Sequence, residues 1–121
     1  MLLVFRYLCS HNHETMRHRS TKYTLEQLSG AICEATGLNS ESLFSRHKDA
    51  AHTTARGVFF MLAREHGHLF QQIGAYTHRH HSTIVNVSQR FQGYYETKDK
   101  SVCRLAAAVE NILSNNSQHL I

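Results

Sequence analysis

The residues with the richest chemistry in this 121-residue sequence form one hexapeptide, HRHHST at residues 78–83. Its imidazole, guanidinium and hydroxyl groups could coordinate a metal ion, form a nucleophile with its base, or contact another molecule. Directly after it, apolar residues recur at the spacing typical of a helix. The hexapeptide therefore stands at the start of a predicted helix, and each of the three chemistries demands different neighbours.

A zinc site is the first chemistry that the histidines could support. Zinc-binding histidines usually stand at positions i and i+4 of a helix, or with three to five residues between them across a turn, and further ligands come from elsewhere. His78, His80 and His81 do not follow this spacing, and no cysteine or carboxylate cluster stands near them in the sequence. We therefore expect no metal and no other cofactor.

Catalysis would pair the hydroxyl of Ser82 or Thr83 with a neighbouring histidine as the base. Adjacent residues rarely reach that geometry, and a third orienting group and an oxyanion pocket would also be needed. The aspartates and glutamates are not grouped with the hexapeptide. We therefore expect neither an enzyme nor a small-molecule substrate.

Recognition of a nucleic acid requires less of the neighbouring sequence. In the first turn of a helix, free backbone N–H groups and the positive end of the helix dipole favour phosphate oxygens. The hydroxyls of Ser82 and Thr83 can add contacts to phosphates or base edges. Arginine commonly reads guanine with two hydrogen bonds, and histidine can donate to the same acceptors. The pattern favours the tip of a recognition helix.

The elements that must position this tip are helices. Proline is absent and apolar residues follow helical spacing, which predicts an all-α fold, a compact multi-helix domain. Thr24 and Gln27 form a capping-box pattern, Gly37 ends the first helix, and Asn39 caps a short second one. A central helix is expected over residues 51–65, two short helices over 69–75 and 81–91, and a last helix over 98–113. The two short helices, joined by a turn of about four residues, form a helix-turn-helix pattern.

The charge and the cysteines indicate the setting of the domain. The net charge is +4, with the basic excess in the first 22 residues and in the middle of the chain. This is the footprint of a nucleic-acid binder, although it could also serve only solubility. Three cysteines without a C-x-x-C pair indicate reduced thiols and a cytoplasmic protein. The apolar N-terminus contains Arg6 and is predicted to be neither a signal peptide nor a membrane span.

Three stretches of the sequence together resemble one known family. Ile73-Gly74, a basic turn and RHHSTIVNV at residues 79–87 resemble the signature of the C-terminal DNA-binding domain of the bacterial replication initiator DnaA. ARGVFFMLARE at residues 55–65 and TLEQLSGAICEATGLNSESLFSR at residues 24–46 are similar to earlier parts of that domain. The resemblance covers residues 24–113 in order, with His80 standing where the family has aspartate. The chain has no P-loop, so it resembles a stand-alone relative.

The resemblance implies a helix-turn-helix domain of the Trp-repressor and DnaA C-terminal type that reads double-stranded DNA, favouring a monomer, in the regulation of replication initiation or transcription. It implies a DNA-binding domain over residues 23–114, between a flexible basic tail at 1–22 and a frayed C-terminus at 115–121. A recognition helix would enter the major groove, and a basic loop would lie against the backbone or the minor groove. The residues expected to contact DNA are Arg79, His80, His81, Ser82, Thr83, Asn86 and Arg90, with Arg46, Lys48 and Arg56 upstream.

An alternative is a protein-interaction or scaffold module that kept the fold and lost DNA binding. The basic loop is poorer in arginine than in the family, and His80 replaces an aspartate, which favours this alternative. It predicts an exposed apolar patch around Phe60, Tyr94 and Tyr95 in place of a basic face. DNA binding instead predicts that affinity rises as the pH falls through about 6.5, if His80 or His81 contacts DNA as a cation.

Overall fold

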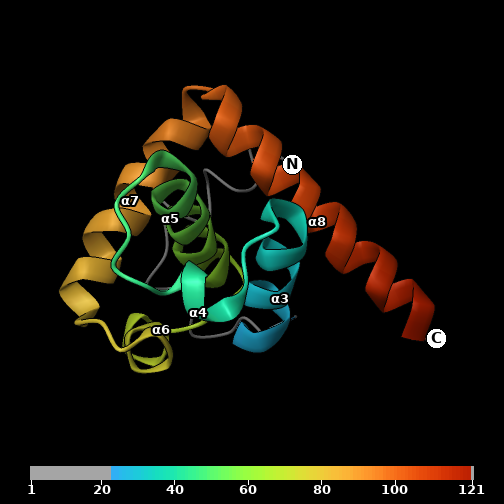
Figure 1. Ribbon diagram of the computed structural model, residues 1–121, viewed down its shortest axis with the longest axis horizontal. Coiled ribbons are helices and arrows are strands. Elements are labelled where there is room, and N and C mark those ends of the chain that lie inside the picture. Colours follow the sequence, from blue (N-terminus) through green and yellow to red (C-terminus); the bar gives the residue numbers. More distant parts are fainter. Residues whose placement is uncertain (1–22, 121) are drawn as a thin grey trace.

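The computed structural model describes the backbone of residues 23–120 and the side chains of residues 23–116. The expected tail at 1–22 lies outside the described residues. The described part contains six α-helices and no strand, which confirms the all-α prediction (Figure 1). The helices are α3 (Leu25–Thr36), α4 (Ser40–Leu43), α5 (Ala50–Glu65), α6 (Phe70–Thr77), α7 (His81–Glu96) and α8 (Lys100–Leu120).

The capping signals at α3 are confirmed. The Thr24 hydroxyl accepts from the Gln27 backbone N–H at 3.0 Å, and the Gln27 side chain accepts from the Thr24 N–H at 2.8 Å. Gly37 follows the helix with φ +82°, a left-handed conformation that glycine adopts without steric cost. These local bonds define both ends of the helix, which is why the sequence alone could predict them.

Helix α5 is the scaffold of the domain. Every residue over 55–63 is buried, and a helix with 3.6 residues per turn can bury such a run only if it is covered on all sides. It contacts α3, α4, α6, α7 and α8, and Figure 1 shows it in the middle of them. The prediction of a central helix is confirmed.

Helix α7 packs on α5 along Ile84, Ser88 and Phe91. Gly57 of α5 leaves the space that the Phe91 ring occupies. The helix continues to Glu96, so its predicted end at residue 91 was wrong. Gly93 lies inside the helix, and a single glycine only weakens a helix without ending it.

Helix α8 crosses α3 and α5 and buries Val102, Ala106, Val109 and Leu113 against them. It extends to Leu120, beyond the predicted end at residue 113, because the serines and asparagines that follow lower helix propensity only slightly. Within residues 23–120, none of the helices combines the length and the apolar character needed to cross a bilayer.

Candidate nucleic-acid interface

The turn between α6 and α7 is shorter and tighter than the sequence predicted. It contains only the three residues 78–80, and the Arg79 N–H donates to the Gly74 carbonyl at 2.9 Å. A Cβ atom on Gly74 would lie 2.6 Å from the Arg79 carbonyl oxygen. The turn therefore passes so close to α6 that position 74 has no room for a side chain, and this approach sets where α7 begins.

His78 ends α6 in the left-handed conformation, with φ 59°. For a residue with a Cβ atom this conformation costs about 1–2 kcal/mol, whereas glycine adopts it freely. His78→Gly should therefore raise the free energy of unfolding by about 1 kcal/mol in urea denaturation. Lys98→Gly, at the other non-glycine residue with positive φ in the described chain, is the matched comparison. A loss of stability in His78→Gly would mean that the imidazole makes a contact of its own.

The first turn of α7 projects its polar side chains into solvent. His80 caps the helix, because its Nδ1 accepts from the Ser82 backbone N–H at 3.1 Å and lies 2.8 Å from the Ser82 hydroxyl. The rings of His80 and His81 are stacked, with centroids 4.5 Å apart. Both histidines, Ser82, Thr83 and Asn86 are exposed. The predicted tip of a recognition helix is thus an exposed helix start.

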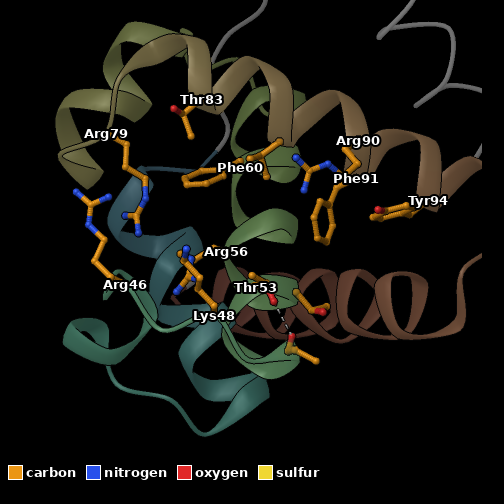
Figure 2. A pocket seen from close by; sticks show the side chains of 13 residues that line it. Arg46, Lys48, Thr53, Arg56, Phe60, Arg79, Thr83, Arg90, Phe91 and Tyr94 are labelled. Carbon is orange, nitrogen blue, oxygen red and sulfur yellow. Dashed lines mark hydrogen bonds between the residues drawn. The ribbon is translucent and has the colours of Figure 1, made fainter.

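A groove of about 880 Å³ separates α7 from the segment that precedes α5 (Figure 2). Its floor is apolar, with Phe60, Val87 and Phe91, and three threonines add hydroxyl groups. None of its thirteen lining residues is acidic. Six of the residues expected to contact DNA line it, namely Arg46, Lys48, Arg56, Arg79, Thr83 and Arg90. The other four, His80, His81, Ser82 and Asn86, are exposed on α7 outside the lining.

Arg56 holds the segment between α4 and α5 in place. The residue is 8% exposed, and its side chain donates to the carbonyl oxygens of Leu43 at 3.2 Å and Ser45 at 3.1 Å, and also to that of His47. Burial lowers the pKa of its guanidinium, and the neighbouring Arg46 lowers it further, while Asp49 raises it. The sequence indicated only the charge of this residue and missed its role in the loop.

Arg79 holds the same segment from the other side. It donates to the carbonyl oxygens of Ser45 at 2.9 Å, Phe44 at 3.3 Å and Thr77 at 3.3 Å. Burial lowers its pKa, and the charges of Arg56 and Arg46 lower it further. The Ser45 carbonyl accepts from both guanidinium groups, which joins the basic segment to α5 and to the helix-turn-helix turn at one point.

A serine, a histidine and an aspartate form a second fastening of this segment. His52 Nδ1 lies 2.7 Å from Asp49 Oδ1, and its Nε2 lies 2.7 Å from the Ser42 hydroxyl. His47 stacks on His52 with ring centroids 4.8 Å apart. The order of contacts is that of a catalytic triad. The Ser42 N–H, which a triad would use to bind an oxyanion, is however bonded to the Asn39 side chain, and neither Ser42 nor His52 lines the groove where a substrate could sit. The contacts therefore tie α4 to α5.

The contact between His52 and Asp49 should weaken in acid. The hydrogen bond from His52 lowers the pKa of Asp49 below its ordinary value. A depressed carboxyl pKa stabilises the fold above the ordinary aspartate range, near pH 4, and that stability is lost as the pH falls through the lower folded-state value. We therefore expect Asp49→Asn to lose stability at pH 7 and to lose less than the wild type between about pH 5 and 2. Urea denaturation across this range measures it, and parallel curves for both proteins would contradict it.

The described residues contain no group of three or more histidines, cysteines, aspartates or glutamates that could hold a metal ion. Cys33 and Cys103 are free thiols, and both are half-buried. Burial raises the pKa of the Cys33 thiol, and a hydrogen bond from Ser40 lowers it in part. Cys33 packs at the edge of the core.

Residues 25–90, from α3 into α7, match the family model of the bacterial DnaA protein helix-turn-helix. The chain belongs to this family. The resemblance seen in the sequence is thereby confirmed, and the DnaA helix-turn-helix family is one of DNA-binding domains. No solved structure was found to match the chain.

In its described part, this member of the DnaA helix-turn-helix family lacks the surface expected of the alternative, a protein-interaction module. That alternative needed an exposed apolar patch at Phe60, Tyr94 and Tyr95. Phe60 is 2% exposed, Tyr95 is half-buried, and Tyr94 alone is exposed, at 40%. The expected patch is not formed, and its place beside α7 is taken by the groove with its cationic rim (Figure 2).

Proposed function

We propose that this protein binds double-stranded DNA in a sequence-dependent manner, as a monomer, and regulates replication initiation or transcription. In this proposal the exposed start of α7 enters the major groove, and the segment with Arg46 and Lys48 lies along the sugar-phosphate backbone. The supporting observation is the groove beside α7, whose lining includes five cationic side chains and no acidic one.

Affinity and sequence preference would come from two parts of this surface. Lysine and arginine side chains that neutralise phosphates release condensed counterions, which supplies affinity without sequence preference. The start of α7 adds exposed donors and acceptors that can reach base edges, and base edges carry the sequence information. Family membership supports both parts, because the matched region ends within the helix that carries these groups.

The test is a selection from random duplex DNA at two salt concentrations. The protein should enrich one short sequence, and the logarithm of its affinity should fall with the logarithm of salt by about 0.9 for each neutralised phosphate. Selection without enrichment, or an affinity independent of salt, would contradict the proposal.

Lys48 provides a test of phosphate contact by the basic segment. Its side chain is exposed at the groove, so Lys48→Ala should weaken binding to all duplexes alike and reduce the salt slope by about 0.9. Lys100→Ala removes the same charge at the exposed start of α8, which is not part of the groove lining, and is the matched control. Equal salt slopes for the two variants would mean that the groove does not contact the phosphate backbone of DNA.

A further inference from the structure

The cap of α7 determines which nitrogen of His80 carries a proton. His80 Nδ1 lies 3.1 Å from the Ser82 backbone nitrogen, and a backbone N–H can only donate. Nδ1 must therefore present its lone pair to this bond. The Ser82 hydroxyl, 2.8 Å from the same nitrogen, can donate to it as well. In the neutral ring, the proton is then on Nε2.

The cap also determines which atom can meet a ligand. With Nδ1 held against the backbone, Nε2–H is the ring's remaining polar group, and the side chain is exposed at the start of the helix. Stacking on the His81 ring, at an interplanar angle of 28°, restricts rotation of the imidazole. His80 therefore offers a fixed hydrogen-bond donor and no acceptor at the tip of α7.

A single outward donor selects among the base pairs. In the major groove, guanine presents two acceptors, N7 and O6, and no donor, whereas cytosine presents only the N4 amino donor. Adenine presents its N7 acceptor beside an amino donor, and thymine presents the O4 acceptor beside a methyl group, so a lone donor finds the most acceptors at guanine. Resting on the proposed DNA binding, we propose that His80 is a specificity-determining residue that reads guanine through Nε2–H. Because Nδ1 accepts the cap hydrogen bond, this contact would be made by the neutral ring, and not by the cationic His80 that the pH expectation from the sequence assumed.

Two substitutions at His80 keep the helix cap and change only the polar group that faces outward. Asparagine and aspartate both cap helices through a side-chain oxygen, but the second group of asparagine is a donor and that of aspartate is an acceptor. In random-duplex selection at pH 8, wild type and His80→Asn should select guanine at one position. His80→Asp should shift that position to cytosine, with a change in relative affinity of about 3- to 10-fold, as expected for one hydrogen bond. Thermal unfolding should show that both variants keep the folded domain.

A second measurement tests the tautomer without DNA. Proton–nitrogen correlation spectra of the full chain, with ¹⁵N-labelled histidine at pH 8, should show His80 protonated on Nε2 and unprotonated on Nδ1. A spectrum with Nδ1–H would overturn the proposal, as would selection of the same base by wild type and His80→Asp. If the wild type enriches no duplex at all, the proposed DNA binding fails and this inference fails with it, whereas a failure confined to the variants concerns His80 alone.

Discussion

Gly74→Ala is expected to lower the free energy of unfolding by about 1–3 kcal/mol, the usual cost of forcing atoms into a filled space. The added Cβ atom would lie 2.6 Å from the Arg79 carbonyl oxygen, which belongs to the backbone and cannot rotate away. The turn must move instead, and the start of α7 moves with it. We therefore also expect DNA affinity to fall more than stability alone would explain at temperatures where the variant remains folded.

Two other glycines provide the controls for this prediction. A Cβ atom added to Gly30 in α3 or to Gly93 in α7 would meet no neighbouring group within 4 Å, and both residues lie inside helices. Alanine at either position should stabilise the protein by about 0.5–1 kcal/mol through helix propensity. Urea denaturation and DNA titration of all three variants measure the difference. If Gly74→Ala matched Gly93→Ala in stability, the tight turn would have no energetic importance.

Arg56→Met should cost about 2–4 kcal/mol of unfolding free energy, because it leaves carbonyl groups of the segment between α4 and α5 without their charged donor. Methionine keeps much of the buried volume, so the loss reports on hydrogen bonds more than on packing. The freed segment carries Arg46 and Lys48 and should exchange its amide hydrogens faster.

DNA binding by Arg56→Met distinguishes loop positioning from direct contact. Because the guanidinium of Arg56 is bonded to carbonyl groups, we expect weaker binding to every sequence with a salt slope nearly equal to that of the wild type. Lys48→Ala, which removes an exposed cation, should lower the slope instead. A fall of about 0.9 in the slope of Arg56→Met would show that this arginine contacts a phosphate. Arg56→Lys keeps the charge but lacks the forked donors, and should restore only part of the stability.

Much of the fold could be predicted because its signals are local in the sequence. The capping box at Thr24, the left-handed Gly37 and the long apolar run of α5 depend on residues only a few positions apart. The start of α7 followed from the same kind of signal. Its end did not, because Gly93 only weakens the helix and the chain continues helical to Glu96.

The parts of the site that could not be predicted depend on distant contacts. Arg79 bonds to a carbonyl group 34 positions earlier in the chain, at Ser45, and Arg56 bonds back to Leu43. In the sequence both residues are simply cations, and nothing nearby distinguishes a buried guanidinium from one that faces solvent. The burial of Phe60 was also missed, because an apolar residue on a well-covered helix has the same sequence signal whether it faces the core or a groove.

The shared Ser45 carbonyl fixes the distance between the two surfaces that would touch DNA. One base pair inserted between their contact points moves them apart by about 3.4 Å and rotates one against the other by about 35°. A protein with a mobile basic segment could follow that change, but here Arg56 and Arg79 bond the segment to α5 and to the turn that precedes α7. The two DNA-contacting surfaces would then keep a fixed spacing. The domain would tolerate base changes between its contact points but would not tolerate an insertion or deletion that changes their spacing.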